Sequence, residues 1–168
     1  MIELMLFVLC VFLLVRHRLY WKNTGNSVFG NEEINFIAHR GHPFNSPENT
    51  LESFKEAERK GFRWIELDLV TTKDGIIICS HNYDLERETN GKGWVRKTDS
   101  KELDYVRTGI YTHPNNTMPL PMLNTVVQQL PDSLFYNFEI KTYRLFDFSV
   151  VRPLVALIKE QNIENHIV

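Results

Sequence analysis

The sequence contains little cysteine and no excess of positive charge. Cys10 and Cys79 are its 2 cysteines, too few for a disulfide framework, and neither has the neighbours of a metal-binding cluster. We therefore expect both thiols to be inert. The 19 Lys and Arg residues are balanced by 21 Asp and Glu, giving a formal net charge of −2. This balance argues against a general nucleic-acid binder, which needs a strongly basic face. A phosphate ligand would need local basic groups or a metal ion.

Long hydrophobic runs are also scarce. The longest, Leu4–Val15, has 12 residues and as a helix spans about 18 Å, short of a hydrocarbon layer of about 30 Å. A cleavable signal peptide would need a positive start and a small-residue cleavage site, but Glu3 lies near the start and no such site follows. A buried core helix is a further alternative. We expect residues 1–21 to form a membrane anchor or signal-like segment.

The charges after the run set the expected orientation. Arg16, Arg18 and Lys22 follow it directly, so the positive-inside rule places the rest of the chain in the cytoplasm, with export as the alternative. Residues 22–33 are polar and contain glycine, which indicates a linker. Residues 34–168 are expected to form the folded domain.

Apolar segments in this domain alternate between strand and helix patterns. A helix is expected to begin near Asn49, with Glu52 three residues on, and to stop at Gly61. Residues 82–119 are expected to be loop-like. Such alternation predicts an α/β fold with a parallel sheet and right-handed crossovers. The expected strands are 34–38, 62–70, 75–80, 134–140 and a start at 166–168, and the later helices are 123–130 and 149–161.

Charged residues recur near the ends of these strands. Side chains two residues apart on a strand share a face, so Glu66 pairs with Asp68 and Glu139 with Lys141. The first and third strands each end in a histidine, His39 and His81. Charged pairs on buried strands are costly unless they serve a purpose. The alternative is that these strands lie at the edges of the sheet and that water solvates their charged faces.

These residue types favour phosphodiester chemistry. Three carboxylates in one pocket repel one another unless a cation lies among them, and oxygen-only ligands select Mg²⁺ or Ca²⁺. Two histidines suit general acid–base catalysis. Arg40 and Lys141 would add positive charge beside the metal.

The sequence resembles the glycerophosphodiester phosphodiesterases. The resemblance begins with HRGHPFNSPENTLESFKEAERKGFRWIELDLVTTKDG and continues through His81, LERETNGKG, LPMLNTVV and FEIK. It implies a TIM (β/α)8 barrel of the PI-PLC-like phosphodiesterase type. It also implies an acid–base pair of His39 and His81, phosphate contacts from Arg40 and Lys141, and one divalent cation, Mg²⁺ or Ca²⁺. The implied metal ligands are Glu66, Asp68 and Glu139.

The resemblance leaves some roles open, and the chain departs from the family pattern in two respects. Glu48 and Asn49 fall in its PENT segment, where a helix-entry role and a substrate contact are both open. The family usually has aspartate after the second histidine, whereas this chain has Asn82, which lacks the negative charge. The match covers residues 35–168, while a TIM barrel needs about 250 residues, so we expect an incomplete domain truncated to about the first half of the barrel.

Three functions follow as expectations. The first is hydrolysis of glycerophosphodiesters to glycerol 3-phosphate and an alcohol, in lipid metabolism. The second keeps the site but takes a lysophospholipid as substrate, which a membrane anchor favours. The third is a non-catalytic, membrane-tethered module.

Overall fold

A computed structural model describes residues 2–20 and 34–168. The chain divides into two compact units, residues 1–34 and 35–168. The expected linker at 22–33 lies outside the described residues.

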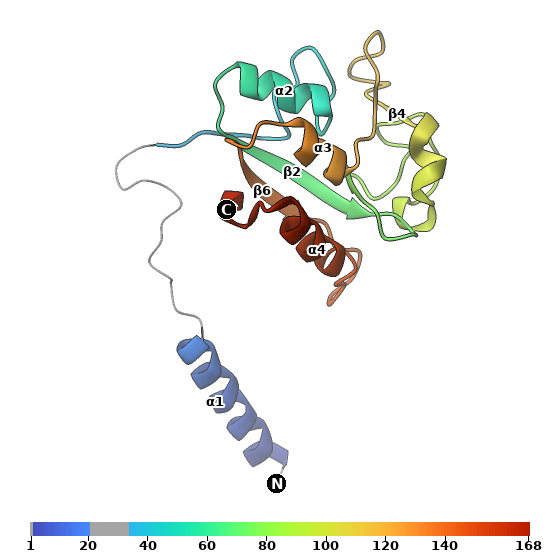
Figure 1. Cartoon of the computed structure of the whole chain (residues 1–168). Coiled ribbons are helices and arrows are strands. Elements are labelled where there is room, and N and C mark those ends of the chain that lie inside the picture. Colours follow the sequence, from blue (N-terminus) through green and yellow to red (C-terminus); the bar gives the residue numbers. More distant parts are fainter. Residues whose placement is uncertain (1, 21–33) are drawn as a thin grey trace. The chain divides into compact units, whose positions relative to one another are not determined.

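A parallel sheet runs through the second unit (Figure 1). Its central strand β2 (Trp64–Thr71) pairs in parallel with β1 (Ile37–Ala38) and with β6 (Phe135–Ile140). Tyr136 of β6 forms a further parallel bridge with Ile167. The parallel neighbours thus follow one another in chain order, as in a barrel of βα units.

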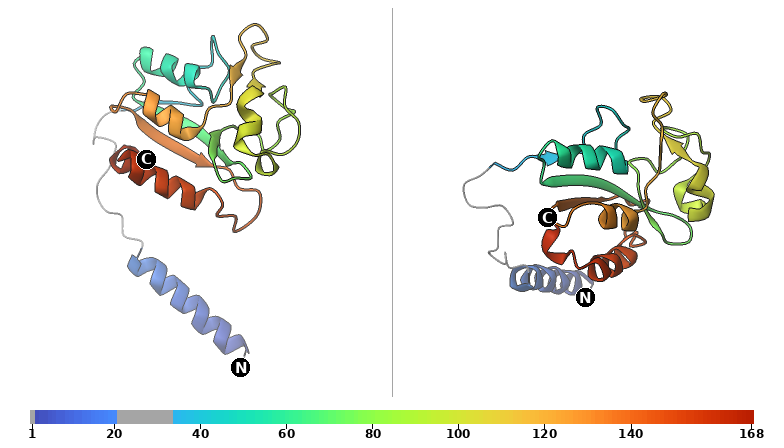
Figure 2. Two further views of the ribbon diagram at one scale, coloured as in Figure 1. Left: turned by 45° about the vertical axis from the view of Figure 1, so that its right-hand side comes forward. Right: turned by 45° about the horizontal axis from the view of Figure 1, so that its top comes forward.

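Three helices connect these strands: α2 (Leu51–Arg59), α3 (Leu123–Gln129) and α4 (Val151–Gln161). Figures 1 and 2 show them lying along β2 and β6. Leu67 and its neighbours on the same face of β2 are fully buried in one core with Phe54 of α2, Leu123 of α3 and Leu154 of α4. The helices therefore cover the apolar face of β2, which leaves the opposite face for Glu66 and Asp68.

The third expected strand is present but runs in the other direction. β3 (Ile77–Cys79) pairs antiparallel with β2, with Leu69 opposite Cys79. The connection is a tight turn in which the Thr72 N–H donates to the Ile76 carbonyl and Gly75 has φ +84°. A parallel pair needs a crossover of a dozen residues or more, so this short connection allows only a hairpin. The expected parallel orientation of this strand is wrong.

The segment expected to be loop-like contains short elements around a small second core, which it shares with β2 and β3. They are the three-ten helices η1 (Val95–Lys97) and η2 (Ser100–Tyr105) and the strand pair β4 (Arg107–Thr108) and β5 (Met118–Pro119). Buried Leu85, Val95 and Leu103 pack there against Val70 and Ile78. At the far end of the chain, the three-ten helix η3 (Glu164–His166) precedes Ile167, so the expected fifth strand is a single bridge.

Helix α2 begins one residue later than its sequence pattern suggests. Thr50 is the N-cap and forms a capping box with Ser53, so Glu52 has no part in the cap. Asn49 adopts a left-handed conformation with φ +54° before the helix. The Asn49 side chain therefore does not cap the helix, and it contacts Asp68 instead.

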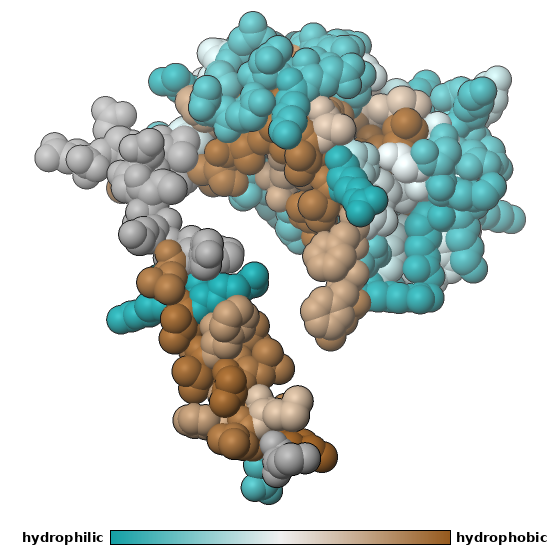
Figure 3. All heavy atoms as spheres, turned by 60° about the horizontal axis from the view of Figure 1, so that its bottom comes forward, coloured by the Kyte–Doolittle hydropathy of each residue, from teal (hydrophilic) through white to brown (hydrophobic). Residues whose placement is uncertain are grey.

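In the first unit, residues 2–20 form helix α1 (Ile2–Tyr20). Hydrophobic side chains are exposed along most of it (Figure 3). No helix in the described part of the chain combines the length and the apolar character needed to cross a membrane. The prediction of a membrane-spanning helix is therefore wrong for α1. The reason is that α1 includes Glu3, Arg16 and Arg18 besides its short apolar run.

Candidate active site

Three carboxylates meet on the face of the sheet that the helices leave free. Glu66 and Asp68 lie on β2, and Glu139 lies on β6 directly beside Asp68 in the strand register. One carboxylate oxygen from each of the three lies within 4.8 Å of the others. Glu66 and Asp68 are buried, whereas Glu139 is exposed. The parity of the two strands accounts for this convergence.

Asp68 is the most heavily contacted of the three. Its Oδ2 lies 2.8 Å from Arg40 Nε, and its Oδ1 lies 2.9 Å from Lys141 Nζ. Asn49 donates from Nδ2 to Asp68 Oδ2 at 2.8 Å and accepts from the Asp68 N–H at 3.1 Å. Burial alone raises the pKa of Asp68, but the hydrogen bonds from Lys141 and Asn49 and the charge of Arg40 outweigh it and hold that pKa below its usual value. Asp68 is therefore ionised and fixed in place.

Glu66 is less well satisfied. Its Oε2 accepts the Arg40 backbone N–H at 2.9 Å, whereas its buried Oε1 has no hydrogen-bond partner among the described residues. Burial and the charge of Asp68 raise the pKa of Glu66, against the Arg40 hydrogen bond and the charge of His39. An unpaired buried oxygen beside two further carboxylates fits a divalent cation, which prefers oxygen ligands. Glu66, Asp68 and Glu139 could therefore hold one.

Arg40 and Lys141 connect the carboxylates to one another and to the rest of the site through ion pairs. Lys141 pairs with Glu139 as well as Asp68, and Arg40 Nη1 reaches Glu48 Oε1 at 2.7 Å. Arg40 itself has φ +56°, an uncommon conformation for a residue with a side chain. That conformation turns both its backbone N–H and its side chain toward the acidic residues.

Gly41 makes this loop possible. It has φ +85°, and an added Cβ would lie 2.6 Å from the Ser53 carbonyl carbon, at the start of α2. We expect Gly41→Ala to lower the free energy of unfolding by about 1–3 kcal/mol more than Gly61→Ala. Gly61 is the matched control, since its φ is +88° but nothing lies within 4 Å of an added Cβ. Urea denaturation of both variants measures the difference, and equal losses would show that the contact with Ser53 is unimportant.

The two histidines follow different strands, both of which pair with β2. His39 directly follows β1 and is exposed, and its charge acts on Glu66. His81 follows the antiparallel strand β3, so it does not end a parallel strand as its position in the sequence suggests. A ring nitrogen of His81 and one carboxylate oxygen from each of Glu48 and Glu88 lie within 4.8 Å of one another. Glu48 therefore connects His81 to Arg40.

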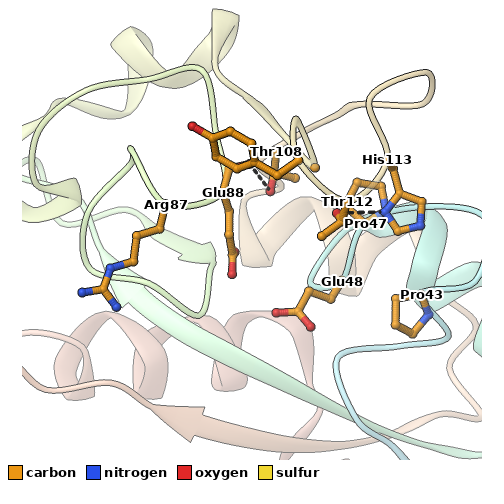
Figure 4. A pocket seen from close by; sticks show the side chains of 10 residues that line it. Pro43, Pro47, Glu48, Arg87, Glu88, Thr108, Thr112 and His113 are labelled. Carbon is orange, nitrogen blue, oxygen red and sulfur yellow. Dashed lines mark hydrogen bonds between the residues drawn. The ribbon is translucent and has the colours of Figure 1, made fainter.

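Glu88 is a carboxylate at this site that the sequence motifs do not indicate. This residue lies in the LERETNGKG segment, whose irregular backbone gives no periodic pattern from which to place a side chain. It lines a pocket of about 380 Å³ together with Glu48, Thr108 and Tyr111 (Figure 4). Asn82 hydrogen-bonds Glu88, so a carboxylate lies near His81 even though the residue after it is an asparagine.

The fold and this site together place the second unit among α/β domains of the TIM-barrel type, with polar residues gathered where the parallel strands end. The sequence profile of the Glycerophosphoryl diester phosphodiesterase family matches residues 39–150. The chain belongs to this family, which confirms the resemblance predicted from its motifs.

Individual relatives agree with this assignment. The chain is 35% identical to a glycerophosphodiester phosphodiesterase of Caldanaerobacter subterraneus, over 79% of this chain and 55% of the relative. It is 31% identical to one of Bacillus subtilis, over 80% of this chain and 49% of the relative. The chain thus spans about half the length of the curated relatives it matches.

Solved structures are similar over the same part. A glycerophosphodiester phosphodiesterase from Agrobacterium tumefaciens matches with a TM-score of 0.72 and 25% identity, covering 80% of this chain and 56% of that one. A phosphodiesterase from Oleispira antarctica, in complex with the product sn-glycerol-3-phosphate, matches with a TM-score of 0.69 and 28% identity. That match covers 76% of this chain and 53% of the other.

Proposed function

We propose that the chain hydrolyses glycerophosphodiesters to glycerol 3-phosphate and an alcohol. The observation that carries the proposal is the convergence of Glu66, Asp68 and Glu139 with two basic side chains. Family membership and the product named for the Oleispira antarctica relative support the same reaction.

The three carboxylates are proposed to hold one divalent cation, Mg²⁺ or Ca²⁺. The unpaired Oε1 of Glu66 is the strongest support, because a buried carboxylate oxygen without a partner is costly. When bound, such an ion supplies positive charge that stabilises the phosphoryl oxygens in the transition state.

Arg40 and Lys141 are proposed to hold the phosphate. Each lies within 3 Å of Asp68, at 2.8 Å and 2.9 Å, so neither side chain is free to move away from the site. Their remaining N–H groups can donate to phosphate oxygens. Fixed donors of this kind stabilise charge that develops during the reaction without reorganising.

His39 and His81 are proposed to move the protons. One accepts the proton of the attacking oxygen, and the other donates a proton to the alcohol oxygen as its bond to phosphorus breaks. A lysophospholipid remains the alternative substrate for the same site, one that a membrane anchor would favour.

The direct test measures glycerol 3-phosphate released by the 168-residue chain from a glycerophosphodiester, with Mg²⁺ or Ca²⁺ added. We expect release that a chelator stops and that either ion restores. Lys73→Met is the control variant, because Lys73 pairs with Asp99 at 2.9 Å outside the site. If no release occurs with either ion, the chain is a non-catalytic module and the proposal fails.

A further inference from the structure

A pocket beside His81 has no part in the proposed roles. It measures about 380 Å³, within the usual range for small-molecule sites. The two carboxylates that line it, Glu48 and Glu88, are those grouped with His81. A group attached to the reacting phosphate could therefore extend past His81 into this pocket.

The charges of the pocket are unevenly balanced. In Figure 4 the carboxylates of Glu48 and Glu88 turn toward each other, whereas the guanidinium of Arg87 points away from them. Arg87 pairs instead with Asp84 at 3.2 Å, and Arg40 pairs with Glu48. Among the ion pairs of residues 34–168, none includes Glu88. Burial and the charge of Glu48 raise the pKa of Glu88, whereas the hydrogen bond from Asn82 and the charges of His81 and Arg40 lower it.

The remaining lining suits an organic cation. Tyr111 contributes an aromatic ring, and Pro43 and Pro47 contribute apolar surface. Carboxylates combined with an aromatic ring and apolar surface are the usual surroundings of bound ammonium groups. An uncharged alcohol would offer these carboxylates no opposite charge.

We propose that this pocket receives the alcohol part of the diester and that Glu88 selects alcohols carrying a positively charged amine. The inference rests on the proposed function, because it takes His81 as the proton donor to the leaving alcohol. A water oxygen forms a bond to phosphorus as the bond between phosphorus and the alcohol oxygen breaks. His39 accepts the proton of the water, the alcohol oxygen takes a proton from His81, and the phosphate stays on glycerol. The ammonium group, two carbons from this oxygen in choline or ethanolamine, would then lie beside the two carboxylates.

The test compares glycerophosphocholine with glycerophosphoglycerol, whose alcohol is uncharged. We expect the wild-type chain to prefer glycerophosphocholine in kcat/KM, and Glu88→Gln to lower this preference about tenfold. Glu86→Gln is the matched control. It removes the same charge two residues away, does not line the pocket, and keeps an oxygen to accept the Gly93 N–H at 2.8 Å.

Three outcomes would overturn the inference. One is a wild-type chain without any preference, a result that needs no variant. Another is an equal loss of kcat for both substrates in Glu88→Gln with an altered pH profile, since Glu88 would then act through His81. The third is a divalent cation that binds wild type in calorimetry, with His81 and Glu88 as its ligands. If neither diester is hydrolysed, the proposed function fails separately, and calorimetric affinities for the two diesters decide the inference.

Discussion

Replacing His81 with alanine is expected to lower kcat by about 10²–10⁴, and replacing His39 with alanine should have an effect of the same size. Each histidine is proposed to move one proton: His81 lies beside Glu48 and Glu88, and the charge of His39 acts on Glu66. The affinity for the divalent cation should barely change, because neither ring is a proposed ligand. Stopped assays of glycerol 3-phosphate release measure kcat, and calorimetry measures the cation.

The pH dependence separates this role from a structural one. One histidine must be unprotonated and the other protonated, so the wild-type rate should follow a bell-shaped curve, and each variant should lose one limb. His166→Ala is the control, since His166 hydrogen-bonds the Leu134 carbonyl at 3.0 Å and lies on η3. Near-full activity in both active-site variants would contradict the mechanism. Loss of cation binding in His81→Ala would instead place His81 among the ligands.

Glu66→Gln is expected to abolish calorimetric binding of Mg²⁺ and Ca²⁺, because a neutral amide replaces the carboxylate whose buried Oε1 lacks a partner. Asp68→Asn should abolish it too. The Gln variant is the cleaner test, since its amide oxygen can still accept the Arg40 N–H. Glu86→Gln serves as the control for a lost carboxylate.

The same two variants should change stability in opposite directions when no divalent cation is present. The pKa of Glu66 is raised by burial, so its charge opposes folding at neutral pH, and Gln should raise the free energy of unfolding. The pKa of Asp68 is lowered by its partners, so its charge favours folding above the usual aspartate range, and Asn should lower that free energy. Denaturation in a chelator measures both changes. In the calorimetric experiment, equal affinity for the cation in wild type, Glu66→Gln and Asp68→Asn would show that the ion is held elsewhere.

The convergence of the three carboxylates follows from strand parity, which the sequence pattern shows, and from the register of β2 and β6. Glu66 and Asp68 alternate with Ile65, Leu67 and Leu69, and this pattern decides which face each side chain takes. The direction of β3 could also have been found, because its turn is too short for a crossover. The parallel arrangement was inferred instead from the general alternation of elements.

Glu88 and the pocket could not be predicted in this way. Their positions depend on contacts between separate parts of an irregular segment, such as the Asn90 N–H to the Arg107 carbonyl at 3.1 Å. The role of Asn49 was open for a related reason. Whether its amide would cap α2 or bind Asp68 depended on a left-handed backbone that sequence patterns do not specify.

The separation between the parallel strands and the segment of residues 82–119 has a practical consequence. The proposed proton donor His81 lies where the two meet, but Glu88, Tyr111 and Thr112 all belong to the segment and none of them is in the buried core that it shares with β2 and β3. A mutant library confined to these three positions could therefore be screened for new alcohol preferences while the sheet and its carboxylates stay unaltered. Redesign of the substrate range in this chain should begin there.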